Sequence, residues 1–461
     1  MLRRSPSLAA VVGGVVAYVG LLIGLGPLND NSYLTHLATG RIIWSSHHIP
    51  SHDPYSWTAP GHAWVVQSWL ASVFYGAADQ LWGKAGVLLL VGVTSAIVAA
   101  LAWTLTRPAR SLLSRMLIML PVIVVATDGG WVERPLLFGL LALSLLLLAA
   151  EDRLDPRWLV PVMWLWVNTH GSFPLGLVAV ALLAIGRRLD GQPWAVELRA
   201  LKWAVIGVLV GAVNPVGPRL LEFPIELLRR QDVLSNVLEW QAPKFTHVGQ
   251  RAFLLELVLV VVALVRRPSW RAGLPVAVFT VAALLGARNV VVASLVFVPM
   301  LAVGIGGLGE VTGEERRPLY RPVAAVLVAL GVLSAAVAAS GPVYSYNGYP
   351  VAAVTWAQRE GLLGPGARVV SRDFVGNYLE GRFGTSVKVF LDDRYDMYPT
   401  QVIDDFVILN EGTAGWEEVL DRYHATAVLW PSHEATGQLL AASPRWRVVY
   451  SDQEFLVAEP R

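Results

Sequence analysis

The sequence predicts a polytopic α-helical membrane protein, with about 11 transmembrane helices and a C-terminal extracytoplasmic α/β domain. Of the 461 residues, 55 % are hydrophobic and only 15 % are charged, whereas about a quarter of the residues of a soluble globular chain are charged. The apolar residues form separate runs near the ~20 residues that a bilayer-spanning helix needs. The composition changes after about residue 345. These observations exclude an ordinary soluble enzyme, a disordered chain and a coiled coil.

The charge balance and the lack of cysteine exclude further classes of protein. The 36 basic and 34 acidic residues leave a net charge of +2, so the chain has no overall basic field for nucleic acid. Because there is no cysteine, disulfides, thiolate metal sites and cysteine nucleophiles are excluded. We therefore expect no nucleic-acid partner and no thiol chemistry.

The apolar runs and the basic residues between them predict the topology. Basic residues are more frequent in the loops on the N-terminal side of the membrane, and such an excess marks the cytoplasmic side. We therefore expect a cytoplasmic N-terminus, a transmembrane domain over 1–345 and an extracytoplasmic domain over 346–461. The expected spans lie at about residues 8–25, 85–106, 112–127, 135–150, 158–170, 172–188, 201–214, 252–266, 272–287, 289–305 and 322–340.

Two external loops are too long to be simple connections. The first loop, 28–84, carries apolar stripes at helical spacing around residues 34–42 and 66–74, which predict two amphipathic helices at the membrane interface. Ile49–Pro54 forms a rigid turn between them. The second long loop covers 215–250.

The C-terminal domain alternates strand and helix patterns, which predicts a small α/β domain with a mostly parallel sheet. The expected strands lie at 368–371, 387–391, 425–430, 446–451 and 455–458, and the expected helices at 351–360, 377–382, 401–409, 416–423 and 434–441.

Two carboxylates of the first external loop are the first candidates for chemistry. Asp30 follows the first span directly, and an outward-facing carboxylate there can take a proton from an acceptor hydroxyl. Asp53 precedes a proline, and His36 lies on the same helical stretch as Asp30. Both aspartates also fit a purely structural role, Asp30 as a helix N-cap and Asp53 as a turn residue. The histidines lack a strong metal-ligand spacing, so the metal site that we test is a divalent ion held by Asp30 and a phosphate.

A second group of polar residues lies at the external ends of the spans. Arginine binds a phosphate with two parallel hydrogen bonds, and charges at membrane depth are usually paired or functional. Snorkelling and helix termination are the structural alternatives for this group. Its members are Glu133, Arg134, Asn168, His170, Asn214, Glu239, Trp240, Arg288 and Asn289.

The C-terminal domain offers one further polar group. Asp392, Asp393 and Arg394 follow the strand expected at 387–391, and the carboxyl ends of strands are where open α/β sheets bind ligands. A turn with helix-capping aspartates explains the same residues. The sequence has no glycine-rich nucleotide motif and no nucleophile elbow, so nucleotide-driven transport and α/β-hydrolase chemistry have no support.

Taken together, these segments resemble the GT-C type membrane glycosyltransferase superfamily, especially a bacterial polytopic branch with a C-terminal α/β domain. The resemblance covers nearly the whole chain. The residues that carry it are Asp30 with Thr35–Arg41, Ile49–Ser56, Trp64 with Gln67–Leu70, Arg134-Pro135, Asn168–Gly171, Asn214-Pro215, Glu239-Trp240, Arg288-Asn289, and Phe390–Arg394 with Met397–Pro399.

The resemblance implies transfer of a sugar from a polyprenyl-phosphate donor to an envelope glycan, lipid or protein acceptor. Such enzymes work on the extracytoplasmic face of the bacterial plasma (inner) membrane. Their first external loop carries an acid that acts as a base or holds a divalent cation, Mg or Mn, and Asp30 fits that position. Relatives tend to have Asp-x-Asp and a Trp-Trp pair there, whereas this chain has Ser32 and Leu34-Thr35.

Two functions therefore stay open. In the first, Asp30 is the catalytic base, and Arg288, Arg134 or His170 stabilises the departing lipid phosphate; His36 and Asn289 are further donor-binding candidates. In the second, the chain is a non-catalytic membrane transporter or scaffold for envelope glycans or lipids. A transporter typically has paired ionisable groups near the bilayer midplane and repeated halves, and the sequence shows few such charges and no repeat.

Overall fold

The computed structural model describes residues 5–230, 238–306 and 311–461. It contains two compact units, which we call the helical unit and the mixed unit. The helical unit consists of Met1–Leu28, Ala78–Ile225 and Val237–Val343. The mixed unit consists of Asn29–Ala77, Glu226–Asn236 and Tyr344–Arg461.

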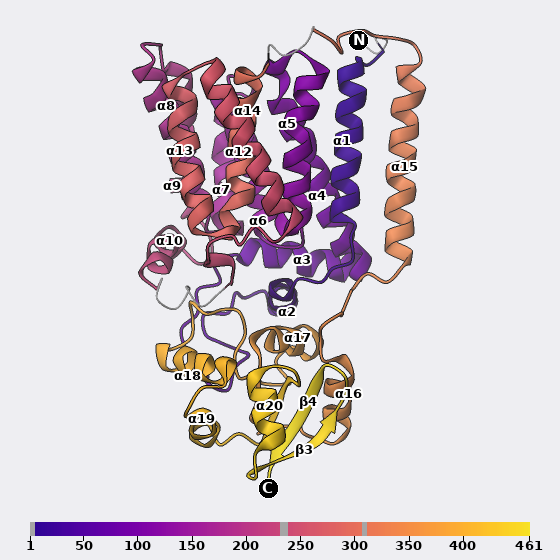
Figure 1. Cartoon of the computed structure of the whole chain (residues 1–461), viewed down its shortest axis with the longest axis vertical. Helices are drawn as coiled ribbons and strands as arrows, with labels where there is room; N and C mark the ends of the chain where they lie inside the picture. The colour runs from indigo at the N-terminus through magenta and orange to yellow at the C-terminus, as the bar shows by residue number, and fades with distance from the viewer. Residues whose placement is uncertain (1–4, 231–237, 307–310) are drawn as a thin grey trace. The chain divides into compact units, whose positions relative to one another are not determined.

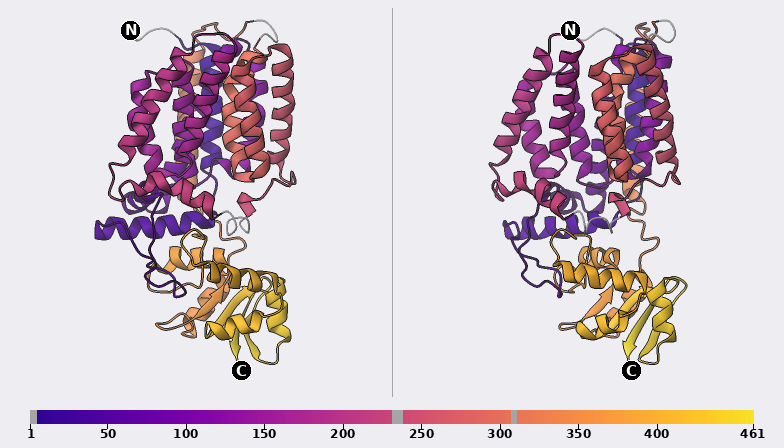
Figure 2. Two further views of the ribbon diagram at one scale, coloured as in Figure 1. Left: turned by 90° about the vertical axis from the view of Figure 1, so that its left-hand side faces the viewer. Right: turned by 60° about the vertical axis from the view of Figure 1, so that its left-hand side comes forward.

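The helical unit is a bundle in which each of the eleven predicted apolar runs forms a helix. Figures 1 and 2 show these helices running side by side. They are α1 (Leu8–Gly24), α4 (Lys84–Leu105), α5 (Leu112–Val125), α6 (Leu136–Ala150), α7 (Leu159–Thr169), α8 (Phe173–Leu189), α9 (Ala195–Gly211), α12 (Val248–Arg266), α13 (Trp270–Leu285), α14 (Val290–Gly304) and α15 (Tyr320–Ser340). Shorter elements join them: η1 (Arg107–Ala109), η2 (Ala126–Gly130), η3 (Pro156–Trp158), η4 (Leu238–Trp240) and η5 (Ala287–Asn289).

The length of the helices bears on the number of membrane crossings. Among the described residues, five helical stretches are long and apolar enough to cross a membrane: Lys84–Ala109, Leu112–Gly130, Val248–Arg266, Ala287–Gly304 and Tyr320–Ser340. Three further apolar helices, α1, α6 and α13, are shorter. The helical architecture with apolar helices of membrane-spanning length is thus confirmed, while the count of eleven crossings stays a prediction.

Small residues set the packing of the first two bundle helices. A Cβ added at Gly20 of α1 would lie 2.6 Å from the Cβ of Ala99 on α4. At the other end of the pair, the indole Nε1 of Trp103 donates to the carbonyl of Ala9 at 3.0 Å. The two helices are therefore fixed at contact distance along their whole length.

The first external loop belongs to the mixed unit and contains the two helices that its periodicity predicts. These are α2 (Asn31–Ser46) and α3 (Trp69–Trp82), whose last turn passes into the helical unit. A Cβ on Gly40 would lie 2.0 Å from the carbonyl oxygen of Ser72, and one on Gly76 would lie 2.5 Å from the carbonyl carbon of Gly40. The backbones of the two helices therefore touch where they cross.

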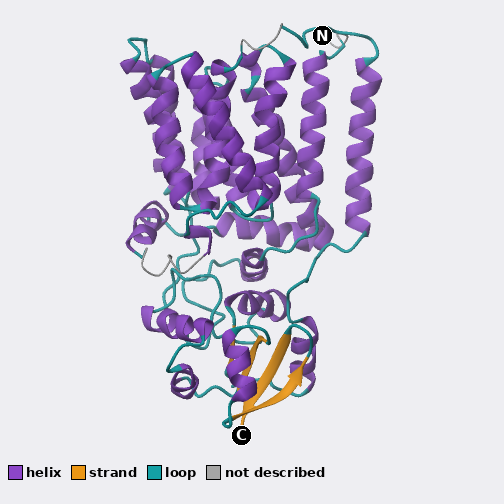
Figure 3. Ribbon diagram, in the orientation of Figure 1, coloured by secondary structure: helices purple, strands orange, loops and turns teal. Residues whose placement is uncertain are grey.

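A small four-stranded sheet forms the centre of the C-terminal part of the mixed unit (Figure 3). Its strands are β1 (Val369–Ser371), β2 (Ala427–Pro431), β3 (Trp446–Ser451) and β4 (Phe455–Pro460), in the order β1-β2-β4-β3. Only β1 and β2 pair in parallel, while β4 pairs antiparallel with both neighbours. The prediction of a mostly parallel sheet was wrong, because β3 and β4 form a hairpin and a parallel pair would need a crossover connection.

The strand predicted at 387–391 does not form. Val389 instead makes an isolated bridge with the first loop, accepting from the Trp57 N–H at 3.0 Å and donating to the Tyr55 carbonyl at 3.1 Å. Asp392, Asp393 and Arg394 therefore do not follow a strand of the sheet. The five expected helices all form, as α16 (Val351–Arg359), α17 (Asp373–Phe383), α18 (Thr400–Glu411), α19 (Trp416–Arg422) and α20 (Ala435–Ala442).

The long loop predicted at 215–250 contains α10 (Arg219–Arg229), η4 and the start of α12. Residues 231–237 of this loop lie outside the described part of the chain.

Candidate functional site

The predicted residues are divided between the two compact units. The helical unit holds Glu133, Arg134, Asn168, His170, Glu239, Trp240, Arg288 and Asn289, and the mixed unit holds Asp30, His36, Asp53, Asp392, Asp393 and Arg394.

Residues from three separate segments of the helical unit form what we call the arginine cluster. Its members are Arg134, the neighbours Glu239 and Trp240, and Arg288. Arg134 forms an ion pair with Glu239. The guanidinium carbon of Arg288 lies 4.5 Å from the centre of the Trp240 ring, a stacking that is typical of arginine on indole. The backbone N–H of Ala287 donates to the carbonyl of Gln241 at 2.9 Å, which holds the segments around η4 and η5 together.

Both arginines lie near the start of a helix. Arg134 lies two residues before α6, and Arg288 lies in η5, which leads directly into α14. The first N–H groups of a helix carry partial positive charge, so each guanidinium adds its charge to a helix N-terminus. This combination of groups is suited to an anion such as a phosphate.

The carboxylate of Glu239 offsets part of this positive charge. Burial raises the pKa of Glu239, but the charge and hydrogen bond of Arg134, with a further effect of Arg288, lower it more, so the pKa lies below its usual value. Glu239 is therefore ionised at neutral pH. Arg134, Arg288 and Glu239 are all half-buried, so the cluster brings two guanidinium groups to one partly buried place.

The other predicted residues of this unit make contacts that fix the ends of helices. The Asn168 amide donates to the carbonyls of Trp164 at 2.7 Å and Gly211 at 3.4 Å. The Asn289 amide donates to the carbonyl of Ala282 at 3.0 Å. These contacts match the structural alternative that the sequence left open for both residues.

His170 and Glu133 complete the predicted set of the helical unit. The Nδ1 atom of His170 accepts from the backbone N–H of Ser172 at 3.2 Å. In a neutral ring this places the proton on Nε2. Glu133 is buried, with 3 % of its surface exposed.

In the mixed unit, Asp30 is the N-cap of α2. Its Oδ1 accepts from the backbone N–H of Tyr33 at 3.2 Å, and the residue is half-buried. His36 follows on the same helix, with its Nδ1 3.0 Å from the hydroxyl of Ser72 on α3. The capping role proposed as an alternative is therefore present, and one carboxylate can be both a cap and a base.

Asp53, Glu380, Asp392 and Arg394 form a second polar group, which we call the carboxylate network. The Nη2 of Arg394 lies 2.8 Å from Asp53 Oδ1, 3.6 Å from Glu380 Oε1 and 2.6 Å from Asp392 Oδ2. All four residues are buried, and the three carboxyl groups share one guanidinium. Asp53 also accepts from the backbone N–H of Ser56 at 2.8 Å, so it is the turn residue that the sequence offered as an alternative.

The imbalance of charge in this network is visible in the pKa values of its carboxyl groups. Burial raises the pKa of Glu380 well above its usual range, and the charge of Asp392 raises it further. Burial also acts on Asp392, but the charge and hydrogen bonds of Arg394 lower its pKa below the usual value. Next to the network, burial and Asp392 raise the pKa of Asp393 to about 7. Glu380 therefore keeps its proton, while Asp392 is the ionised partner of Arg394.

Sequence analysis missed two residues of this region, Asn377 and Glu380 of α17. The Asn377 amide donates to the hydroxyl of Thr35 at 2.7 Å and to Asp393 Oδ1 at 2.5 Å, and Glu380 accepts from the same hydroxyl. The two residues are three apart, so they share one helix face. A polar pair on a helix face usually points to solvent, and the sequence carried no other signal for them.

The divalent cation expected at Asp30 stays a prediction. Across the part of the chain that the structure describes, no group of three or more His, Asp or Glu side chains could hold a metal. A divalent cation bound at Asp30 would therefore take its remaining oxygen ligands from a phosphate and water, as Mg²⁺ commonly does.

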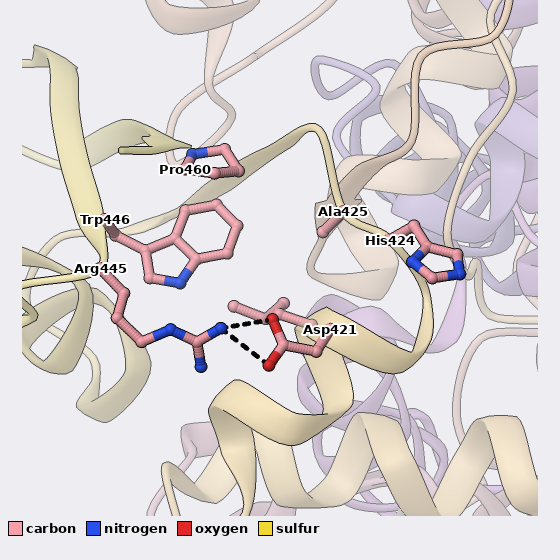
Figure 4. A pocket seen from close by; sticks show the side chains of 7 residues that line it. Asp421, His424, Ala425, Arg445, Trp446 and Pro460 are labelled. Atoms are coloured by element: carbon pink, nitrogen blue, oxygen red, sulfur yellow. Dashed lines mark hydrogen bonds and ion pairs between the residues drawn. The ribbon is translucent and has the colours of Figure 1, made fainter.

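Figure 4 shows a cavity of about 320 Å³ on the C-terminal part. Its charged groups pair with each other, because Arg445 Nη2 lies 2.9 Å from both carboxylate oxygens of Asp421. The indole of Trp446 is 5 % exposed, so it offers little surface to a ligand. We assign no function to this cavity.

Comparison with known proteins supports the fold and not a sequence family. No protein-family model matches the sequence, and no curated protein matches it either.

Solved structures with a similar fold include the oligosaccharyltransferase AglB from Archaeoglobus fulgidus. The structure in complex with an inhibitory peptide and a dolichol-phosphate has a TM-score of 0.55 and 12 % identity, over 91 % of this chain and 69 % of that chain. The structure tethered to an acceptor peptide with the NVT sequon has a TM-score of 0.54 at 12 % identity and the same coverage. The apo form has 0.52 at 13 %, over 90 % and 69 %.

AglB is a GT-C type glycosyltransferase, so the expected GT-C resemblance is confirmed for the fold. This fold and the five long apolar helices agree with the expected membrane protein.

Proposed function

We propose that the chain is a glycosyltransferase that moves a sugar from a polyprenyl-phosphate-linked donor to an envelope glycan, lipid or protein acceptor. The observation that carries the proposal is the arginine cluster, where two guanidinium groups at helix starts share one carboxylate. The GT-C-like fold adds support, since the A. fulgidus enzyme of similar fold has been solved with a dolichol-phosphate. The proposed place of the reaction is the extracytoplasmic face of a bacterial plasma membrane.

In the proposed reaction, Asp30 is the general base. Its carboxylate takes the proton from the nucleophilic group of the acceptor while that group bonds to the anomeric carbon of the sugar. The bond between this carbon and the phosphate oxygen breaks, and its electron pair stays on the phosphate. The lipid phosphate thus gains negative charge, which Arg288 and Arg134 stabilise as preorganised donors.

Secondary roles go to the remaining candidates. His36, His170 and Asn289 are proposed to contact the donor, and the ring of Trp240 offers a face for the sugar. The C-terminal part is proposed to bind or position the acceptor. A divalent cation, Mg or Mn, is proposed only at Asp30, where the phosphate of the donor would complete its ligands.

The test of the base is Asp30→Asn. Asparagine is as good an N-cap as aspartate, so this variant keeps the start of α2 and removes only the proton acceptor. We expect turnover to fall by about a hundredfold or more. The measurement is transfer of radiolabelled sugar from a panel of polyprenyl-phosphate sugars to mixed envelope glycans, by full-length protein in nanodiscs.

The matched control is Asp155→Asn. Asp155 is the exposed N-cap of η3, where it accepts from the Arg157 N–H at 3.0 Å, so the control makes the same change at another cap. Wild-type turnover in Asp30→Asn at normal expression would contradict the base role. A parallel series with EDTA decides the metal requirement, because loss of transfer that added Mg²⁺ or Mn²⁺ restores would establish it.

The alternative function, a transporter or scaffold, is decided in the same assay. Failure to transfer from every donor, with binding of polyprenyl phosphate intact, would favour it. Deleting the C-terminal part is not a suitable test, because Thr35 and Asp53 of the first loop lose buried partners when Asn377, Glu380 and Arg394 are removed. Such a deletion would disturb Asp30 and the C-terminal part at once.

A further inference from the structure

The start of α2 is held by a side chain that lies more than 300 residues further along the chain. Asn377 is fully buried on α17, with 0 % of its surface exposed. Its amide nitrogen donates to the Thr35 hydroxyl at 2.7 Å, and its Oδ1 accepts from the amide of Asn31 at 3.3 Å. Because Asn31 and Thr35 are four residues apart, they lie on one face of the first turn of α2, and Asn377 contacts both ends of that turn.

This first turn is the turn that Asp30 caps. The carboxylate of Asp30 is fixed by the backbone N–H of Tyr33, which lies between the two residues that Asn377 contacts. The position of the carboxylate therefore depends on how firmly this turn is held.

Asn377 is itself held in place by close backbone packing. A Cβ added at its neighbour Gly376 would lie 2.0 Å from the carbonyl oxygen of Leu391, and one at Gly381 would lie 3.0 Å from the Leu34 side chain. Helix α17 therefore packs closely against both the 391–393 segment and α2. Asp393 accepts the second hydrogen bond of the Asn377 amide at 2.5 Å, so the amide has little freedom to rotate.

We propose that Asn377 is a positioning residue for Asp30, and that the C-terminal part of the chain builds the setting of the base rather than only receiving the acceptor. This inference rests on the proposed function for its catalytic meaning. Leucine at position 377 fills a similar volume but donates no hydrogen bond, so the first turn of α2 loses its buried partner while the packing of α17 is kept. The buried hydroxyl of Thr35 and the carboxylate of Asp393 then each lose a hydrogen-bond donor. We expect the first turn of α2 to shift so that these groups reach other partners.

The first measurement is hydrogen exchange of the full chain in nanodiscs, which does not depend on activity. We expect Asn377→Leu to lower the protection of the amides of residues 33–35 by about tenfold, the size of one buried hydrogen bond. The control is Thr436→Val, which removes a buried hydroxyl that donates to the Leu409 carbonyl within the C-terminal part. This control should leave residues 33–35 unchanged.

The second measurement separates positioning from folding by kinetics. A shift of about 1 Å in a reacting group costs up to about a hundredfold in rate. We therefore expect Asn377→Leu to lower kcat by tenfold to about a hundredfold, with the KM for the donor within about twofold of wild type, and Thr436→Val to change neither. Thr35→Val, which removes the partner on α2 and leaves α17 intact, is expected to act in the same direction with a smaller effect.

The outcomes are distinct. Unchanged protection at residues 33–35 in both Asn377→Leu and Thr35→Val overturns the inference, whatever the activity. If Asn377→Leu does not fold, Thr35→Val decides alone, because it alters no residue of the C-terminal part. A wild-type protein that transfers no sugar contradicts the proposed function, while the exchange result still decides whether Asn377 holds the turn of Asp30.

Discussion

The arginine cluster and the carboxylate network carry charge imbalances of opposite sign. In the helical unit, Arg134 and Arg288 share one carboxylate, that of Glu239. In the mixed unit, the three carboxyl groups of Asp53, Glu380 and Asp392 share the one guanidinium of Arg394. Both regions are at least partly withdrawn from water, so neither imbalance is screened as it would be at an exposed surface.

The two imbalances can be relieved in different ways. A carboxyl group that cannot be paired takes up a proton, as the raised pKa of Glu380 indicates. An arginine cannot lose its proton in the physiological range. Protonation of Glu380 therefore lowers the excess negative charge of the network from within, whereas only an anion can offset the charge of the two guanidinium groups. This difference indicates a structural region in the first case and a binding region in the second.

The largest expected effect comes from removing the shared guanidinium of the network. Arg394→Leu leaves the ionised Asp392 buried without its partner, which typically costs about 3–5 kcal/mol. It also removes the stacking of Arg394 on Trp64, whose ring centre is 4.4 Å away. We expect the β2 strand to lose hydrogen-exchange protection by an amount that corresponds to this cost, measured on the full chain in nanodiscs.

Two control variants sharpen this result. Arg447→Leu removes an exposed arginine that pairs with Glu459 at 3.4 Å, and we expect a change of no more than about 0.5 kcal/mol. Glu380→Gln should be tolerated, because that carboxyl group already holds its proton. Strong destabilisation by Glu380→Gln, equal to that of Arg394→Leu, would contradict the assignment of the proton.

A smaller effect, with opposite signs, is expected in the arginine cluster. Arg288→Gln removes a charged donor and should weaken the binding of polyprenyl phosphate by about tenfold or more. Glu239→Gln removes the competing anion and should strengthen binding by about threefold, the size of a partly exposed ion pair. The measurement is a binding isotherm on nanodisc-embedded protein.

The control for this pair is Arg251→Gln, which changes an exposed arginine whose Nε donates to the Phe245 carbonyl at 3.1 Å. It should leave the affinity unchanged. Weaker binding in Glu239→Gln would mean that Glu239 positions Arg134 for the phosphate, and the cluster would then resemble the carboxylate network in being a structural unit.

The elements of this chain differ in how well they can be predicted from the sequence. Apolar periodicity and length located all eleven helices of the bundle and both amphipathic helices of the first loop, because these signals are local. The segment 387–391 has the composition of a strand, yet Val389 pairs with Tyr55 and Trp57 of the first loop. The choice of pairing partner depends on residues far away in the chain, which periodicity cannot indicate.

The same limit applies to the polar residues. The sequence placed Arg134, Glu239 and Arg288 on one side of the membrane. The structure joins Arg134 and Glu239 through an ion pair between residues 105 apart, and Arg288 lies over the ring of Trp240. Sequence analysis identified Asp30 together with its capping role, because an N-cap is a local feature. It missed Asn377, whose partners Thr35 and Asn31 come from the first loop, since a buried contact between distant segments has no local pattern.

The smallest expected effect is the pH dependence of the mixed unit, and it tests how the excess negative charge in and beside the network is relieved. Burial and the charge of Asp392 raise the pKa of Asp393 to about 7, and burial raises that of Asp396 to about 6. A carboxyl group with a raised pKa holds a proton in the folded state that it lacks in the unfolded state, so stability falls as the pH rises from about 4 to 7. The lowered pKa of Asp392 acts in the opposite direction and reduces stability only below about pH 4.

The mixed unit should therefore be most stable near pH 4–5 and lose protection of β2 toward neutral pH. The groups that face Asp393 are Asp30, Asp392, Ser32, Asn377 and Tyr395. Of these, Asp392 and Asp30 raise the pKa of Asp393 through their charge. Asp393→Asn should flatten the decline between about pH 4 and 7 and leave the loss of stability below pH 4 unchanged. A decline of the same size in this variant would mean that the excess negative charge is relieved at another carboxyl group, and that proton uptake beside the network does not set its stability near neutral pH.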